Sequence, residues 1–167
     1  KRFNKMKSKL ILSLFFIFFI LISCEKDDIC IEDEIGTPRI ILSFYDKIDK
    51  NLRKPVENLL IKGLEKEDTL DIFSGDSIAI PLKNNSNLSK YEFIINAGEE
   101  KSNNDTIHIL YSRYDLYINR ACGFKSNFIL NNPPTLIFND HNPWIDEIIK
   151  LKDTVLNENH SHLAIYH

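Results

Sequence analysis

The chain has 167 residues, of which 43% are hydrophobic and 27% are charged, and its formal net charge is −3. A chain of this length and composition is large enough to bury a hydrophobic core of its own. With 21 basic residues against 24 acidic ones, it has no positive excess with which to hold phosphates, so we exclude nucleic acid as a partner.

The first element is a basic stretch followed by an apolar run. Positions 1–9 carry five basic residues and no acid, and Leu10–Ile22 is apolar except for Ser13. A bilayer core needs roughly 20 apolar residues, so this run predicts a secretory signal peptide, residues 1–23, that is removed after export. Removing those five positive charges takes the formal net charge from −3 to −8. Such an acidic chain is not expected to bind anionic headgroups by charge.

The end of the apolar run carries a candidate lipidation site. The order Leu21-Ile22-Ser23-Cys24 resembles a bacterial lipobox, in which the cysteine thiol receives diacylglycerol and becomes the first residue of the mature protein. The bulky Leu21 disfavours an ordinary signal peptidase site. Two or three acyl chains hold a protein stably on a membrane, so we expect the membrane to be a partner through a lipid anchor at Cys24. The alternative is an apolar segment that happens to end in cysteine.

The residues after Cys24 form an acidic tether, expected to span residues 24–36. Lys26, Asp27 and Asp28 resemble the surface export signal of Bacteroidota lipoproteins. That resemblance implies an outer-membrane lipoprotein exposed at the cell surface. The alternatives are the periplasmic face of the membrane, or a solvated, self-repelling tether that no export factor reads.

Two cysteines remain after the lipid takes Cys24. Cys30 and Cys122 would lie beyond the inner membrane, where disulfides persist. An even remainder in an oxidising compartment predicts a disulfide between them. The alternative is a pair of buried or reactive thiols.

Residues 37–167 are expected to form a single β-sandwich domain. Short runs in which apolar residues alternate with polar ones predict strands that bury one face. These runs are Ile40–Phe44, Leu59–Ile61, Ile78–Leu82, Tyr91–Ile95, Ile107–Tyr111 and Phe124–Leu130. Turn-forming residues separate several of them, as in 84–87. The pattern is typical of an all-β antiparallel sandwich, immunoglobulin-like or transthyretin-like.

Two segments of this domain are less regular. The apolar phase is odd through Tyr111 and even from Tyr114 onward, which predicts a bulge or bend near Ser112-Arg113. Residues 143–152 permit one short helix that Asn142-Pro143 would cap. Alternation in 149–152 and again near the C-terminus instead favours a closing β-hairpin.

Several stretches together resemble a known family. They are "CEKDDIC", "IILSFYDK", "YINRACGFKSNFIL", Trp144-Ile145 and "NENHSHLAIYH". They are similar to a domain-of-unknown-function family of small flavobacterial lipoproteins, over nearly the whole mature chain. The resemblance implies paired cysteines and an all-β domain, and it supplies neither an activity nor catalytic residues.

The stretch around Gly123 is the first candidate binding site. Arg120 and Lys125 flank this glycine and would present a small anion or a glycan, with Tyr117 and Phe124 as stacking faces. The structural alternative is that Gly123 gives the backbone freedom beside a disulfide while the aromatic residues belong to the core.

The histidines near the C-terminus are a weaker candidate. His160, His162 and His167, with Glu158 or His141, offer zinc ligand types, but nothing in the pattern specifies the fourth ligand. An exposed polar turn explains the same residues. The acids of 25–34 lack the alternating residues and glycine of a calcium loop. We therefore predict no metal and no cofactor.

Four tripeptides resemble the Bacteroidota O-glycosylation sequon, in which Asp precedes Ser or Thr and an apolar residue follows. The hydroxyl residues are Thr69, Ser77, Thr106 and Thr154. The alternative is that Asp ends a turn and an apolar strand begins after it.

No motif for catalysis is present: the chain lacks a G-x-S-x-G elbow, a Walker loop, H-E-x-x-H and G-x-G-x-x-G. We therefore expect a non-enzymatic binding module for a protein or a glycan. The alternatives are a structural or accessory subunit of an outer-membrane complex, and a hydrolase whose groups come from distant loops.

Overall fold

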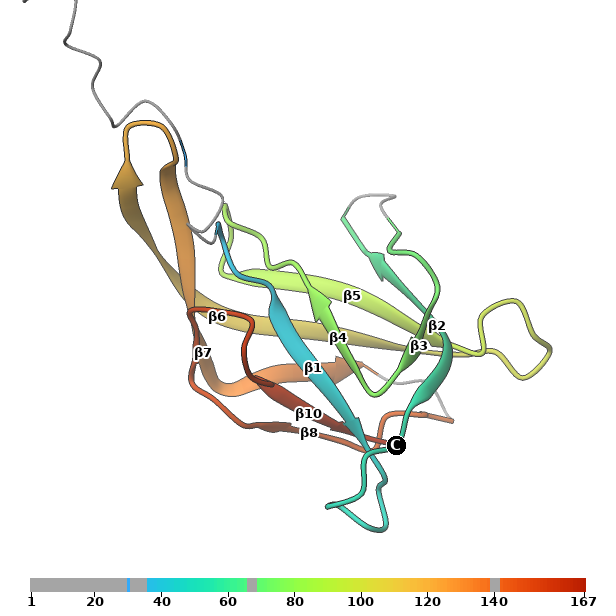
Figure 1. The fold of residues 1–167 in the computed structure, drawn as a ribbon. Helices are drawn as coiled ribbons and strands as arrows, with labels where there is room; N and C mark the ends of the chain where they lie inside the picture. Colours follow the sequence, from blue (N-terminus) through green and yellow to red (C-terminus); the bar gives the residue numbers. More distant parts are fainter. Residues whose placement is uncertain (1–29, 31–35, 66–68, 139–141) are drawn as a thin grey trace, which may run out of the picture. The chain divides into compact units, whose positions relative to one another are not determined.

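The computed structural model describes residues 30, 36–65, 69–138 and 142–167. The chain divides into a smaller unit, residues 1–34 and 118–123, and a larger unit, residues 35–117 and 124–167. The predicted signal peptide, Cys24 and the export signal lie outside the described residues. Within the described ranges all regular structure is β, and no helix is suited to spanning a membrane (Figure 1).

Among the described residues, one sheet has four strands. In sheet order they are β4 (Ser77–Ile80), β1 (Ile40–Tyr45), β10 (Leu163–Tyr166) and β8 (Glu147–Lys150). β1 pairs antiparallel with β4, and β10 pairs antiparallel with β8. The two central strands, β1 and β10, run parallel, with Leu42 opposite Leu163 and Tyr45 opposite Tyr166.

The other sheet has six strands in the part of the chain that the structure describes. In order they are β3 (Phe73–Gly75), β2 (Val56–Gly63), β5 (Leu88–Ile95), β6 (Asn103–Asn119), β7 (Gly123–Phe138) and β9 (Thr154–Val155). β2 pairs antiparallel with both β3 and β5, β5 pairs antiparallel with β6, and β7 pairs antiparallel with β9. Figure 1 shows β6 and β7 as the longest strands.

The hydrophobic core lies between the two sheets and confirms the period-two pattern. In β1, Ile40, Leu42 and Phe44 are at most 1% exposed, and β6 contributes Ile107 and Ile109 at 1% each. A side chain on every second position therefore points inward, as the two faces of a strand require. The predicted all-β sandwich is confirmed, with one parallel strand pair in an otherwise antiparallel-rich structure.

The parallel pair has a physical explanation. All four residues of β10 are buried, and such a continuous apolar strand suits the centre of a covered sheet rather than an alternating edge. Because β1 and β10 come from opposite ends of the described domain, no short turn forces them to run antiparallel.

The short helix allowed for residues 143–152 does not form. The segment instead contains β8, whose Glu147 and Lys150 pair with Tyr166 and Leu163. The amide of Asp146 donates to the carbonyl of Tyr166 at 2.8 Å, which begins this sheet pairing before a helical turn could close. β8 and β10 do pair antiparallel, but they do not form the closing hairpin that we expected, because β9 lies between them in the chain and pairs with β7 in the other sheet.

β6 continues without interruption through Ser112-Arg113, where we expected a bulge or bend. What changes at that point is burial. Alternate residues are buried as far as Tyr111, whereas all residues of 112–117 are exposed. The shift of apolar phase therefore marks the place where this strand leaves the covered core.

Candidate functional site

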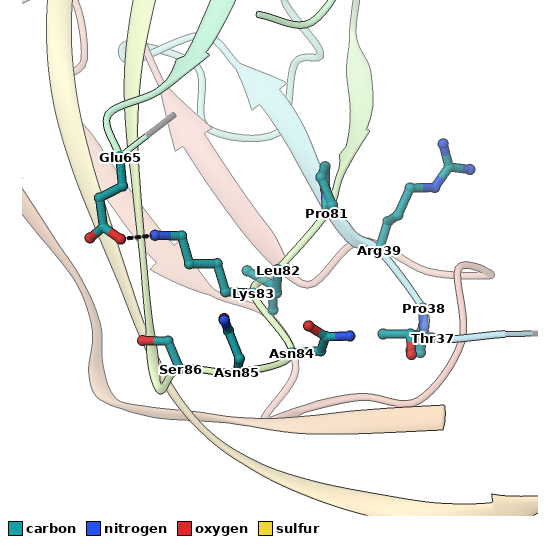
Figure 2. A pocket seen from close by; sticks show the side chains of 10 residues that line it. All are labelled: Thr37, Pro38, Arg39, Glu65, Pro81, Leu82, Lys83, Asn84, Asn85 and Ser86. Carbon is teal, nitrogen blue, oxygen red and sulfur yellow. Dashed lines mark hydrogen bonds and ion pairs between the residues drawn. The ribbon is translucent and has the colours of Figure 1, made fainter. Parts of the chain in front are cut away.

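A cleft of about 650 Å³ lies in the larger unit, where β1 begins, β4 ends and β5 begins (Figure 2). Its lining residues are 37–39, Glu65 and 81–86. Residues 81–86 carry the chain from one sheet to the other, so the cleft sits at the end of the sandwich core. Its volume is within the range of small-molecule sites, roughly 300 to 1,000 Å³.

Buried hydroxyl groups fix the loop that forms one side of the cleft. Tyr111 donates from its hydroxyl to the carbonyl of Lys83 at 3.0 Å, and the Lys83 amide donates to Ser89 Oγ at 3.0 Å. Ser89 and Tyr111 are joined at 2.7 Å, and the Tyr91 hydroxyl donates to the carbonyl of Pro81. Hydrogen bonds to buried hydroxyl groups therefore fix the backbone of residues 81–83 in the absence of ligand, which lowers the entropy cost of binding.

The two tyrosines remain protonated donors at ordinary pH. Burial raises the pKa of Tyr91 to about 12, and burial also raises the pKa of Tyr111, against the hydrogen bond with Ser89. Both phenols are almost fully enclosed, at 9% and 0% exposed. A neutral phenol keeps its hydrogen for the backbone carbonyl that it holds.

The charges of the cleft are largely compensated. Glu65 pairs with Lys83 and, at 3.5 Å, with Lys90; the hydrogen bond from Lys83 leads the effects that hold its pKa low. Arg39 is engaged by Glu158, with Nε to Oε1 at 2.9 Å and Nη2 to Oε2 at 2.6 Å. Figure 2 shows the Arg39 side chain extending away from the Glu65–Lys83 ion pair. The uncharged polar side chains that line the cleft are those of Thr37, Asn84, Asn85 and Ser86.

A second, more apolar hollow of about 180 Å³ adjoins this cleft. It shares Glu65 and residues 81–83 with the larger one and adds Leu70 and Tyr91. Together they offer amide and hydroxyl groups on one side and a small apolar recess on the other. The sequence did not predict the larger cleft, because the pattern at 84–87 indicates only a turn.

The sequence-based site is only partly assembled. Tyr117 and Phe124 are exposed, and their rings meet edge to face with centroids 5.2 Å apart. The alternative that these two rings belong to the core is wrong. Lys125 is half-buried in the larger unit, while Arg120 is exposed in the smaller unit.

The smaller unit contains the predicted disulfide. Cys30 and Cys122 are bonded, with their Cα atoms 4.9 Å apart across a sequence separation of 92. The Cys122 amide donates to Asn119 Oδ1 at 2.7 Å, and Gly123 has φ +70°, a left-handed conformation that suits glycine. The alternative of two free thiols is therefore wrong.

The histidines serve the fold. His162 is 2% exposed, and its Nδ1 accepts the amide hydrogen of Ile41 at 3.0 Å. The His167 ring contacts Phe44 and Trp144 edge to face and lies 3.0 Å from the Lys54 carbonyl. Burial lowers the pKa of both rings. His141 is outside the described residues, and within them no group of His, Cys, Asp or Glu could hold a metal ion.

The four sequon hydroxyl residues differ in accessibility. Thr69 and Ser77 are exposed, whereas Thr106 in β6 and Thr154 in β9 are half-buried. Asp105, which precedes Thr106, is 1% exposed, and its Oδ2 accepts the amides of Trp144 and Ile145. The Asp105 tripeptide therefore has a structural explanation.

The described residues form an all-β sandwich with a disulfide and, where β1 begins and β4 ends, a cleft of small-molecule size. By sequence the chain belongs to the Family of unknown function (DUF6452), whose model matches residues 58–167. That match includes Glu65, residues 81–86 and Cys122. No curated protein and no solved structure matches the chain.

Proposed function

We propose that this chain is an outer-membrane lipoprotein, anchored through Cys24 and exposed at the cell surface. Its sandwich binds a neutral, hydroxyl-rich ligand of the glycan class in the cleft formed by residues 37–39, Glu65 and 81–86. The ligand is held and released without chemical change. The observation that carries the ligand-binding part of this proposal is the charge-compensated cleft of about 650 Å³, and the lipobox pattern at Leu21–Cys24 supports the anchor.

The lining groups favour a polyhydroxylated ligand over a charged one. An asparagine amide both donates and accepts hydrogen bonds, as sugar hydroxyls do. A free anion would compete with Glu65 for Lys83 and with Glu158 for Arg39, at the expense of ion pairs already made. The apolar recess beside Leu70 and Tyr91 suits a methyl-bearing substituent on the same ligand.

Calorimetric titration of the mature chain in detergent with maltotriose and with triacetylchitotriose tests this proposal. We expect saturable binding of at least one trisaccharide, and a loss of about tenfold in affinity when Asn84→Ala and Asn85→Ala are combined. Asn51→Ala, an exposed asparagine in the turn before β2, is the matched control and should bind as wild type does. Equal affinity in the cleft variant and the control would contradict the assignment.

The anchor and the address are tested separately. Cys24→Ala should leave the protein unlipidated and unable to partition into detergent, and partitioning like that of wild type would exclude lipidation at Cys24. Replacing Lys26, Asp27 and Asp28 with Ala should retain the lipid but remove the protein from the reach of protease added to intact cells. Unchanged protease access would exclude an export role for these residues.

A second candidate function, an accessory subunit of an outer-membrane complex, is favoured by exposed apolar side chains on β7. Besides Phe124 they are Ile129, Leu136 and Phe138. β9 pairs with Phe128 and Ile129 of this strand. Beyond them, Pro133 and Pro134 lack amide hydrogens, which hinders strand-to-strand pairing there and leaves side-chain contacts as the means of docking. A photo-crosslinker at residue 138 in intact cells should capture one defined protein if this candidate is correct, and a crosslinker at Ile72 should not.

A further inference from the structure

β6 pairs with β5 only as far as Leu110, and beyond that residue we call β6 and the neighbouring part of β7 the ribbon. Apolar side chains near the end of this ribbon suggest a second membrane contact. Beyond Tyr111 the side chains of β6 are no longer covered. We define the ribbon patch as Tyr114, Leu116, Tyr117 and Phe124, which are 44%, 47%, 53% and 70% exposed. Alternation along β6 puts Tyr114 and Leu116 on the face opposite Tyr117, so neither face of the ribbon is purely polar.

The chain connects this patch directly to the disulfide. Tyr117 is followed by Ile118 and Phe124 is preceded by Gly123, and residues 118–123 belong with Cys30 to the smaller unit. Neighbouring Cα atoms are about 3.8 Å apart whatever the orientation of the units. The Cys30–Cys122 bond therefore ties the N-terminal segment to the ribbon end rather than to the start of β1 alone.

The disulfide shortens the distance available between the domain and the anchor. Cys24 precedes Cys30 by six residues, which span at most about 20 Å when extended. Without the bond, the nearest described residue of the larger unit is Gly36, twelve residues beyond Cys24 and up to about 40 Å away. The anchored residue lies at the headgroup layer, which is about 5 to 8 Å thick. Because the bond limits the chain between the anchor and Cys30 to about 20 Å, the ribbon end can contact that layer.

We propose that the ribbon patch contacts the lipid headgroup layer of the membrane that carries the anchor, as a second attachment that orients the domain. This proposal rests on the proposed lipid anchor at Cys24. Tyrosine is enriched at membrane–water interfaces because its ring is apolar and its hydroxyl is polar. The contact depends on aromatic and aliphatic side chains, which suits a chain whose net charge would not draw it to anionic headgroups.

Fluorescence quenching in vesicles tests the contact. The full lipoprotein carrying Phe124→Trp is reconstituted into phosphatidylcholine vesicles whose acyl chains are brominated near their carbonyl ends. Ile48→Trp is the matched control, because Ile48 is 88% exposed in the loop after β1. Trp144 is present in both variants, and its signal is subtracted using wild type. We expect quenching of about half the emission at residue 124, and none at residue 48, because the interface lies within the reach of such bromines.

The possible outcomes separate this proposal from the anchor. If the protein floats with the vesicles but residue 124 is not quenched, the anchor stands and the ribbon contact is overturned. If residue 124 is unquenched with blue-shifted emission and the protein elutes as a dimer, a second copy covers the patch, which also overturns the contact. If neither variant floats, anchoring at Cys24 has failed and the contact fails with it.

Discussion

Ile41 and His162 exchange two hydrogen bonds. The Ile41 amide donates to His162 Nδ1 at 3.0 Å, and the His162 amide donates to the Ile41 carbonyl at 2.9 Å. Because Nδ1 accepts, the neutral ring carries its proton on Nε2. Immediately after His162, β10 pairs in parallel with β1, so this exchange fixes where the pairing begins.

We predict that the domain loses stability as the pH falls below about 6.5, the ordinary pKa of an unfolded histidine. Burial leads the effects that lower the pKa of His162, Lys152 and His160 lower it further, and Glu158 opposes them. Below pH 6.5 the unfolded chain therefore binds more protons than the folded one, and stability declines toward the folded pKa. His167, whose pKa is also lowered, acts in the same direction.

Urea unfolding at pH 7.5 and pH 5.5 measures this effect. His162→Asn retains an oxygen acceptor for the Ile41 amide, so its loss of stability between the two pH values should be smaller than that of wild type. An equal loss in both proteins would show that His162 does not contribute to the pH dependence.

A second prediction concerns Asp105. Its Oδ2 accepts the Trp144 amide at 3.0 Å and the Ile145 amide at 2.8 Å, in the interior of the sandwich. Asp105→Ala leaves both amides without this acceptor and should lower the free energy of unfolding by about 3 kcal/mol. Asp105→Asn keeps one oxygen and should cost less. Urea midpoints compare the variants, and an unchanged midpoint for the alanine variant would contradict this role.

The third prediction concerns Tyr91 at high pH. An unfolded tyrosine has a pKa of about 10, whereas burial raises the pKa of Tyr91 to about 12. Above pH 10 the unfolded chain loses its proton first, so stability should fall as the pH rises toward 12. Absorbance at 295 nm should show a late ionisation step to which Tyr91 and Tyr111 both contribute, and Tyr91→Phe should reduce its amplitude. A wild-type titration in a single step near pH 10 would contradict the buried donor.

The fourth prediction concerns the Cys30–Cys122 bond. For a loop of this length the chain-entropy model gives about 4 to 5 kcal/mol. The bond also restrains the folded chain, because it closes a short loop between Cys30 and the β-domain. Removing the bond therefore raises the entropy of the folded state as well as that of the unfolded state, and the two effects partly cancel. By the logarithmic dependence on loop length we expect a net loss of about 2 kcal/mol for the Cys30→Ser, Cys122→Ser variant. Urea unfolding measures it, and a loss above 4 kcal/mol would contradict the shorter folded loop.

The fifth prediction separates the four sequons. If the mature protein is O-glycosylated, peptide mapping by mass spectrometry should find the modification at Thr69 or Ser77, which are exposed. Thr106 should be unmodified, because the preceding Asp105 is buried beneath the Trp144 segment and cannot be recognised in the folded chain. A glycan on Thr106 alone would contradict this dependence on accessibility.

Local pattern was sufficient to predict most strands. Ile40, Leu42 and Phe44 alternate because a strand that buries one face must place an apolar side chain at every second position. The same reasoning did not predict that Phe124 would be exposed. Alternation identifies which face a residue occupies, but not how far along the strand the opposing sheet extends to cover that face.

The candidate cleft was beyond prediction for a related reason. Thr37, Glu65 and residues 81–86 come from three separate stretches, none of which carries a recognisable motif. They meet because β1 and β5 begin, and β4 ends, at the same end of the sandwich. The hydroxyl groups of Tyr91 and Tyr111 also fix the loop there by hydrogen bonds to the carbonyls of Pro81 and Lys83. Neither the strand pairing nor these hydrogen bonds has a signature in local sequence.

The sequence by itself was enough to identify the all-β class and the paired cysteines, since the first depends on periodicity and the second on counting. It also carries the lipobox pattern that suggests an anchor. The tertiary structure decided the parallel pairing of β1 and β10, the structural role of His162, and the meeting of Thr37, Glu65 and Asn84 around one cleft. Those features depend on contacts between residues far apart in the chain, which form only when the two sheets pack.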